Sequence, residues 1–304
     1  MELKIEVNNL EISTQHNRLI HDCTFSLPSS SILNIIGESG SGKSLSVKAL
    51  CSVLPEAFNY SGIIKFNGVE LSKQKLELLR GKKLSMIFQE SSGALNPLMT
   101  LEKQITELLV YHRICPRDKI ENHIVELLNK SGLHRKYGKK YPHELSGGMK
   151  QRGQIAIALA SNPEVLICDE PTTALDPQTS AQLLDEFEGL ANSGYSLIFI
   201  THDFGNVIRL GGFLSVMYAG YTVENGLVAD IKKSPSHPYT KALLDSRPEF
   251  SKPLYSIPGD MPGSDEITGC PFYSRCDKRQ VLCSTQIPSW SVSGSSRVRC
   301  HFPL

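Results

Sequence analysis

The hydrophobic residues of the N-terminal part of the chain predict strands followed by one helix. The pattern of strands and turns ends in an apolar run over residues 31–36, Ser-Ile-Leu-Asn-Ile-Ile. A run of this length that stops at a glycine, here Gly37, is typical of a buried strand. Apolar residues then recur on one side of a helix from Lys43 until Pro55 ends the pattern.

Between about residues 90 and 160 the hydrophobic period becomes 3.6 residues, which indicates helices. Two groups of apolar residues each share one helix face: Leu101, Ile105, Leu108 and Leu109, then Ile120, Ile124, Leu127 and Leu128. Gly132 follows the second group and is the expected C-cap. This pattern predicts a helical subdomain, at about 90–160, inserted into a larger domain.

Strands and helices alternate on both sides of that helical stretch. Strand-length apolar runs cover 84–88, 165–168 and 196–200, and a helical pattern at 183–190 lies between the last two. Such alternation indicates a mostly parallel sheet. We therefore predict an α/β fold, with one domain over residues 1–246.

The composition fits a globular protein without a membrane segment of its own. The 32 Lys and Arg against 31 Asp and Glu leave a net charge of +1. That balance argues against a protein that neutralises a long run of nucleic-acid phosphates. No apolar run reaches the 18 residues that would cross a bilayer, and the N-terminus lacks the features of a signal peptide. We expect a cytosolic chain whose membrane contact is peripheral.

Residues 247–304 differ in texture from the rest. They hold 7 of the 17 prolines and show little helical or strand periodicity. Four of the eight cysteines also lie here: Cys270, Cys276, Cys283 and Cys300. Because cytosolic thiols are normally reduced, such a cluster indicates a metal or cluster site rather than disulfides. We predict a small, loop-rich, cysteine-containing C-terminal extension.

Residues 37–44, Gly-Glu-Ser-Gly-Ser-Gly-Lys-Ser, match the P-loop pattern between a strand and a helix. The glycines let backbone N–H groups turn toward phosphate oxygens, and the helix N-terminus adds partial positive charge. Lys43 is expected to reach the β- and γ-phosphates, and the Ser44 hydroxyl to bind Mg²⁺. The predicted ATP-binding residues of this loop are Gly37, Glu38, Ser39, Gly40, Ser41, Gly42, Lys43 and Ser44.

Two acidic residues, Asp169 and Glu170, follow the apolar strand at 165–168. They are expected at the carboxyl edge of the sheet, where α/β folds bind their ligands. Asp169 suits the Mg²⁺ shell. Glu170 suits a general base that polarises the water attacking the γ-phosphate.

A second helix N-terminus that can bind phosphate is predicted at Leu145-Ser-Gly-Gly-Met-Lys-Gln-Arg152. Ser146 is a good N-cap, and two glycines at a helix start leave N–H groups open to an anion. A capped helix that binds no ligand is the alternative for this segment taken alone.

These motifs, in this order, resemble those of ABC-type ATPases. The segment 145–151 resembles the signature motif of that family, and Gln89 at a strand end resembles its Q-loop. Residues 174–176, Ala-Leu-Asp, resemble the D-loop, and His202 within Thr-His-Asp resembles the switch histidine. The resemblance implies a P-loop ATPase with an ABC-type nucleotide-binding domain.

In that family two nucleotide-binding domains pair head to tail, and each ATP lies between the P-loop of one and the signature of the other. The resemblance implies contacts to the partner's ATP by Ser146, Gly147 and Gly148. The implied catalytic residues are Glu170, His202, which holds the γ-phosphate and orients the base, and Gln89, which contacts the attacking water. The implied Mg²⁺ ligands are Ser44, Gln89 and Asp169.

One expected feature of the family is absent from the sequence. An aromatic residue that stacks on adenine usually lies some 25–30 residues before the P-loop lysine. The corresponding loop here reads Thr14-Gln-His16-Asn, where His16 either stacks on the base or is an ordinary solvated histidine.

The C-terminal part resembles one branch of the family, the ATPase subunits of oligopeptide/dipeptide/nickel importers. The resemblance rests on Ser-His-Pro-Tyr-Thr from residue 236, Ile-Pro-Gly from 257, and residues 269–276. In this branch the cysteine set is associated with a 4Fe–4S cluster. The spacing C-x5-C-x6-C-x16-C lacks the close pairs of most zinc sites. Zinc, with His301 as a further candidate ligand, and no metal at all are the alternatives.

The resemblance implies an ATPase subunit that energises import of small peptides or of a chelated metal such as nickel, from the cytoplasmic face of the membrane. The implied partners are a second ABC ATPase subunit, favoured as a different chain, two transmembrane permease subunits, and an extracellular substrate-binding protein, but not nucleic acid. One alternative is a soluble ABC ATPase that acts on nucleic acid or the ribosome. Another is a regulator gated by its cysteines.

Overall fold

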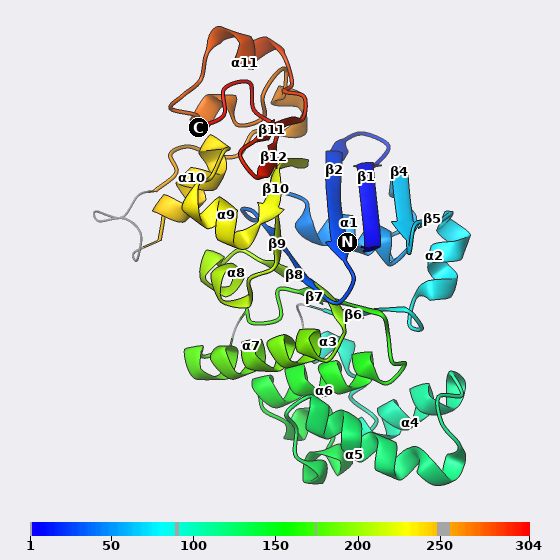
Figure 1. Ribbon diagram of the computed structural model, residues 1–304. Coiled ribbons are helices and arrows are strands. Elements are labelled where there is room, and N and C mark those ends of the chain that lie inside the picture. Colours follow the sequence, from blue (N-terminus) through cyan, green and yellow to red (C-terminus); the bar gives the residue numbers. More distant parts are fainter. Residues whose placement is uncertain (1, 89–90, 174, 248–255) are drawn as a thin grey trace.

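The computed structural model describes residues 2–88, 91–173, 175–247 and 256–304, and a large sheet forms its centre (Figure 1). The strands of its main path are β1 Leu3–Ser13, β2 Arg18–Pro28, β3 Ile32–Ile36, β4 Asn59–Phe66, β5 Val69–Glu70, β6 Leu84–Ile87, β7 Val165–Asp169, β8 Ser196–Thr201, β9 Phe213–Tyr218 and β10 Tyr221–Leu227. Their order is β5-β4-β1-β2-β10-β9-β3-β8-β7-β6.

Strands β9, β3, β8, β7 and β6 form a parallel core. Every residue of β3, β7 and β8 is buried. Apolar runs of this kind are expected where helices cover both faces of a parallel sheet. The strands predicted at 31–36, 84–88, 165–168 and 196–200 are confirmed.

The other half of the sheet is antiparallel, so the expectation of a mostly parallel sheet is wrong for that half. Strand β1 pairs antiparallel with both β2 and β4, and β10 pairs antiparallel with β9. Burial alternates along much of β1, as expected of a strand with only one face on the core. The sheet is therefore mixed, and its parallel half carries the P-loop.

Eleven α-helices occur in the described residues. They are α1 Lys43–Leu50, α2 Lys73–Leu79, α3 Ser91–Ala94, α4 Leu101–Tyr111, α5 Ile120–Lys130, α6 Gly147–Leu159, α7 Pro177–Asn192, α8 Phe204–Leu210, α9 Val228–Lys233, α10 Pro238–Asp245 and α11 Val281–Thr285. Helix α1 begins at Lys43 as predicted but ends before the predicted stop at Pro55. Gly132 follows α5 with a φ of 67°, the left-handed conformation expected there.

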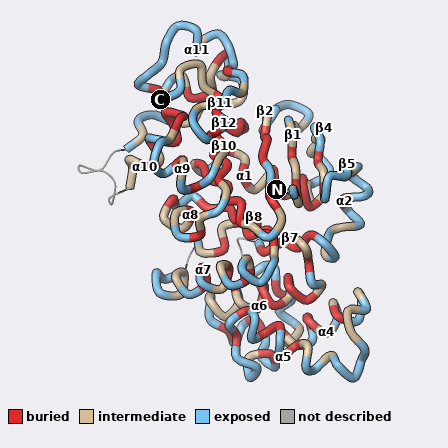
Figure 2. The backbone as a smooth tube through the Cα atoms, in the orientation of Figure 1, coloured by how far each residue is buried: buried red, intermediate tan, exposed pale blue. Residues whose placement is uncertain are grey.

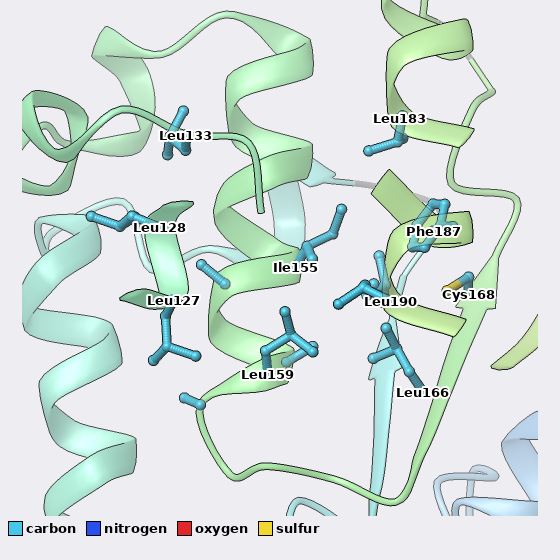
Figure 3. Packing of buried hydrophobic residues seen from close by; sticks show 14 of the residues in the cluster. Leu127, Leu128, Leu133, Ile155, Leu159, Leu166, Cys168, Leu183, Phe187 and Leu190 are labelled. Atoms are coloured by element: carbon cyan, nitrogen blue, oxygen red, sulfur yellow. The ribbon is translucent and has the colours of Figure 1, made fainter. Parts of the chain in front are cut away.

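Helices α3 to α6 form the inserted helical subdomain, at the opposite end of the molecule from the C-terminus (Figure 1). Its core is continuous with that of the sheet (Figure 3). Leu127 and Leu128 of α5 and Ile155 of α6 belong to the same buried cluster as Phe187 of α7 and Leu166 of β7. Helix α6, which begins at the signature segment, is therefore fixed against the rest of the domain by apolar packing.

The extension contains more regular structure than its sequence predicted. Strands β11 Ser291–Ser293 and β12 Ser296–Val298 form a hairpin, and β12 pairs with β10 at Glu224 and Val298. Short helical turns surround this hairpin, and buried residues run from the sheet into it (Figure 2). Strands of three residues are too short to give a periodic pattern, which is why the sequence did not reveal them.

Candidate nucleotide-binding site

The P-loop connects β3 to α1, and two of its glycines lie where a side chain would not fit. A Cβ on Gly37 would lie 2.2 Å from the carbonyl oxygen of Met217. Gly42 has a φ of 101°, and a Cβ there would lie 2.1 Å from Cδ1 of Ile20. Both positions therefore require glycine for the loop to close against β2 and β9.

Lys43 points its ammonium group back into this loop. Its Nζ donates hydrogen bonds to the carbonyl oxygens of Gly37, at 2.8 Å, and Glu38, at 2.9 Å. Burial lowers the pKa of Lys43. The nearby carboxylates, led by that of Glu170, oppose this shift and favour the charged form. A buried cation held beside open backbone amides suits a phosphate group.

Ser44 and Asp169 form a pair of hard oxygen donors at the carboxyl edge of the sheet. The Ser44 hydroxyl donates to Oδ1 of Asp169 at 2.8 Å. Burial raises the pKa of Asp169, and the hydrogen bond from Ser44 opposes that shift. Carboxylate and hydroxyl oxygens are ligands that Mg²⁺ accepts, so these two residues fit the predicted metal site. The third predicted ligand, Gln89, lies outside the described residues.

Glu170 and His202 come from neighbouring strand ends and meet beside the P-loop. The Nδ1 atom of His202 lies 3.3 Å from Oε2 of Glu170, and Thr173 donates to the same oxygen at 3.0 Å. The Glu170 side chain is 15% exposed and that of His202 is 59% exposed. A carboxylate held by a histidine and a hydroxyl, and still open to solvent, can accept a proton from a water molecule.

One cavity of about 610 Å³ is lined by Lys43, Ser44, Glu170 and His202, but not by Asp169. Its lining is Gly37, Glu38, Ser39, Gly40, Gly42, Lys43, Ser44, Leu45, Glu170, His202 and Leu243. Ser41 is buried behind the loop and does not line it. Leu243 of α10 was not predicted, because nothing in its local sequence distinguishes it from other apolar helix residues.

The signature segment lies elsewhere on the same chain. Ser146 caps α6 as predicted, since its hydroxyl accepts from the N–H of Met149 at 3.4 Å. Ser146, Gly147 and Gly148 do not line the cavity of their own P-loop. Of the D-loop resemblance, Asp176 caps α7 and Ala174 lies outside the described residues. His16 lies exposed in the turn between β1 and β2.

Two contacts to Glu38 were not predicted from the sequence. The N–H of Glu38 donates to the Tyr239 hydroxyl at 2.9 Å. The Glu38 carboxylate pairs with Arg275 of the extension, at 2.6 Å between Oε2 and Nη1. Tyr239 lies in the His-Pro-Tyr segment, whose sequence indicates only the oligopeptide/dipeptide/nickel branch and no role at the P-loop. Its contact joins residues 201 positions apart, which local sequence patterns do not reveal.

The four cysteines of the extension line one small cavity together with His237. Burial raises the pKa of Cys270 to about 12 and that of Cys300 to about 11. His237 is 1% exposed, and its Nδ1 accepts from the N–H of Tyr239 at 3.0 Å. Its Nε2 has no hydrogen-bond partner in the part of the chain that the structure describes. Among those residues, no three His, Cys, Asp or Glu side chains form a group that could hold a metal ion.

No helix within the described residues is long and apolar enough to span a bilayer. The sequence matches two known protein families. The model of the ABC transporter family matches residues 20–173. The model of the oligopeptide/dipeptide transporter C-terminal region matches residues 223–283.

Individual relatives cover nearly the whole chain. It is 39% identical to the oligopeptide transport ATP-binding protein AppD of Bacillus subtilis (strain 168), over 99% of this chain and 97% of AppD. Identity is 37% to the oligopeptide transport ATP-binding protein OppD of Salmonella typhimurium, over 99% of this chain and 94% of OppD.

Solved structures agree on the fold. CbiO1 from Clostridium perfringens, part of the ABC transporter complex cbiONQ, superposes with a TM-score of 0.68 at 24% identity. The match covers 76% of this chain and 91% of cbiO1. The chain therefore belongs to the ABC transporter family, as an ATPase with the C-terminal region of the oligopeptide/dipeptide branch.

Proposed function

We propose that this chain is the ATP-hydrolysing subunit of an importer for small peptides. The observation that carries the proposal is the single cavity that joins Lys43, Glu170 and His202, in a chain with an oligopeptide/dipeptide C-terminal region. Both relatives described above are named for oligopeptide transport, which supports peptide over chelated nickel as the cargo. The same names argue against the alternative of an ATPase that acts on nucleic acid or the ribosome.

The residues of the cavity divide the chemistry of ATP hydrolysis among them. Lys43 and the loop amides bind the phosphates. Ser44 and Asp169, with Gln89, would hold Mg²⁺, which when bound neutralises charge on the phosphate oxygens. Glu170 accepts a proton from the attacking water, and His202 orients that carboxylate. The hydrogen bond from Thr173 limits the motion of the Glu170 carboxylate.

The assembly that this function requires contains further chains. We propose that Ser146, Gly147 and Gly148 contact the nucleotide held by a second, different ATPase subunit. Two permease subunits would carry the cargo, an extracellular protein would deliver it, and this chain would lie on the cytoplasmic face. Closure on ATP and opening after hydrolysis would drive the permeases through differential affinity for the closed state.

Affinity purification from detergent-solubilised membranes of the native host tests this assignment. We expect two multi-spanning proteins to copurify, and ATP hydrolysis by the complex to rise when the peptide-loaded binding protein is added. Recovery of ribosomes or DNA in place of membrane proteins would contradict it. Stimulation by a nickel chelate and not by peptides would overturn the choice of cargo.

We also propose that the four cysteines hold a 4Fe–4S cluster, with zinc and no metal at all as the alternatives. Four thiols around one cavity, beside a buried histidine whose Nε2 has no partner in the described residues, suit a bound group. A single zinc ion needs all ligand atoms within about 2.3 Å of one point. The described residues contain no such single-ion group. A cluster, whose ligands sit on separate iron atoms, does not need that grouping, although an extension without metal would also lack it.

Anaerobic purification distinguishes the two metals. Brown protein that absorbs near 400 nm, with iron and sulfide in matched amounts, is the expected result. Colourless protein that contains zinc would contradict the cluster. Cys276→Ser should reduce the absorbance, whereas Cys115→Ser, outside the extension, should leave it unchanged.

The division of the chain at residue 246 remains our proposal. Residues 248–255, which lie outside the described part of the chain, fall at that point, while the matched C-terminal region begins within β10, at residue 223. Because β12 pairs with β10, the extension is attached to the sheet and not only tethered to it. Limited proteolysis that first cleaves near residue 250 would support the boundary, and first cleavage within β10 would contradict it.

A further inference from the structure

Arg275 connects the C-terminal extension to the P-loop. Its guanidinium forms a bidentate pair with Glu38, at 2.6 Å from Nη1 to Oε2 and 3.0 Å from Nη2 to Oε1. The Arg275 side chain is 6% exposed and that of Glu38 is 28% exposed. Buried, bidentate pairs of this geometry are much stronger than ion pairs on the surface.

The extension holds Arg275 in place independently of Glu38. The guanidinium donates to the carbonyl oxygens of Pro258, at 2.9 Å, and Ile257, at 3.3 Å. It also donates to the hydroxyl of Tyr218 at 3.3 Å. The Tyr218 ring in turn packs on Tyr239 and on Phe272, with centroids 4.6 and 5.2 Å apart. The arginine therefore reaches Glu38 from a rigid, largely apolar support.

Glu38 is an acid in a loop that binds anions. Its carboxylate is close enough to influence Lys43, where it is among the charges that favour the protonated ammonium. Glu38 also lines the nucleotide cavity. Left without its partner, this carboxylate would repel the polyphosphate of a nucleotide, because like charges at short range in a partly buried site are weakly screened.

We propose that Arg275 is a positioning residue of the nucleotide site: supplied by the extension, it neutralises Glu38 and orients it away from the phosphates. The extension thereby completes the phosphate site of the ATPase domain. This inference rests on the proposed nucleotide site. In a different interpretation, the pair only attaches the extension to the domain. The two interpretations make opposite predictions for the ATP affinity of a variant in which both Glu38 and Arg275 are replaced.

The test is equilibrium titration of the purified full chain with Mg-ATP, in the wild type and four variants. Arg275→Met should raise the Kd on the order of tenfold, which corresponds to about 1.4 kcal/mol. Arg275→Lys should retain most of the affinity, because it keeps the charge. Glu38→Gln should bind at least as tightly as the wild type. Glu38→Gln combined with Arg275→Met should restore the affinity that Arg275→Met loses, because no unpaired carboxylate remains.

The matched control is Arg279→Met, which removes another arginine of the extension. Within the described part of the chain, the hydrogen bonds of Arg279 go to the carbonyl oxygens of Ser274 and Cys276 and not to the P-loop. We expect its Kd to equal that of the wild type. The loss in Arg275→Met should also appear in KM more than in kcat. Thermal unfolding checks that each variant is folded.

Two results would overturn the proposal. One is an unchanged Kd in folded Arg275→Met. The other is a double variant that binds ATP as weakly as Arg275→Met, which would make the pair an attachment only. If Arg275→Met does not fold, Arg275→Lys is compared with the double variant instead. Equal affinity of the two supports the proposal, and weaker binding by the double variant makes the pair an attachment only. Failure of the wild type to bind ATP, or binding unaffected by Lys43→Ala, would instead contradict the nucleotide site itself.

Discussion

Glu170 stands on an unusual backbone at the end of a buried strand. Its φ of 48° is one that non-glycine residues rarely adopt, and its N–H donates to the carbonyl oxygen of Ile200 at 3.0 Å. Strained conformations of this kind persist where the surrounding structure holds them, and they concentrate at functional sites. Here the conformation directs the carboxylate toward His202 and the P-loop, whereas the preceding Asp169 faces Ser44.

Replacement of Glu170 by Gln should therefore remove hydrolysis while ATP still binds. The amide keeps the size of the side chain but cannot accept a proton, and general-base assistance contributes about 10²–10⁴-fold. Release of phosphate by the assembled transporter measures the rate, and titration with ATP measures binding. The control is Glu56→Gln, which changes an exposed carboxylate beyond the end of α1 that does not line the nucleotide cavity. A rate near that of the wild type would show that another group takes the proton.

Most residues of this site could be predicted because each sits in a short motif whose place in the fold is set by a strand end. Lys43 follows from the P-loop pattern, Asp169 and Glu170 from the rule that ligands bind at the carboxyl ends of the strands, and His202 from the resemblance to the family. Arg275 could not be predicted in the same way. Its partner Glu38 is 237 positions away, and the pair forms only because the extension docks on the sheet.

At the scale of elements, one carboxylate links two neighbouring strands of the parallel half of the sheet to a strand of the antiparallel half. Glu164, just before β7, accepts from Lys83 before β6 and from Lys4 of β1, at 2.6 and 3.1 Å between Nζ and the carboxylate. These hydrogen bonds, that from Lys83 first, lower the pKa of Glu164 from 4.5 to about 2. The sequence predicted strands β6 and β7 but not their junction with β1. The contact from Lys4 forms only because β1 lies in the antiparallel half of the sheet.

The lowered pKa makes this junction sensitive to acid. A carboxyl whose pKa is lower in the folded state stabilises the fold above its unfolded pKa, and that stabilisation is lost as the pH falls from about 5 toward 2. Because Glu164 is 30% exposed, solvent screening limits its contribution to about 1 kcal/mol. Glu164→Gln should therefore lower the urea midpoint at pH 7 and lower it by about half as much at pH 3.5.

Glu56→Gln again serves as the control, since it removes a carboxylate without disturbing the junction. Its urea midpoint should follow that of the wild type at both pH values. An equal loss of stability for Glu164→Gln at pH 7 and pH 3.5 would mean that the charge of Glu164 is not what stabilises the junction.

On the scale of the whole molecule, the two helix N-termini that are predicted to bind phosphate, those of α1 and α6, do not line the same cavity. The P-loop opens into the cavity with Glu170 and His202, while Ser146 and the glycines after it lie outside that cavity. Gly148 packs close to α7, where a Cβ would lie 2.7 Å from Cγ2 of Thr179. A helix start that packs on α7 and lies outside the cavity of its own P-loop fits the proposed contact with the nucleotide of a partner ATPase.

Ser146→Arg separates these two roles of the chain. A bulky cation at the start of α6 should block the site shared with the partner and leave the chain's own P-loop intact. Binding of ATP by the isolated chain should then match the wild type, while hydrolysis by the assembled transporter falls on the order of 10²-fold, as for loss of one phosphate-stabilising donor. Ser295→Arg, exposed in the turn between β11 and β12, is the matched control and should hydrolyse normally. If Ser146→Arg weakened ATP binding in the isolated chain, the signature would serve its own nucleotide. A head-to-tail pair of ATPases would then not be needed.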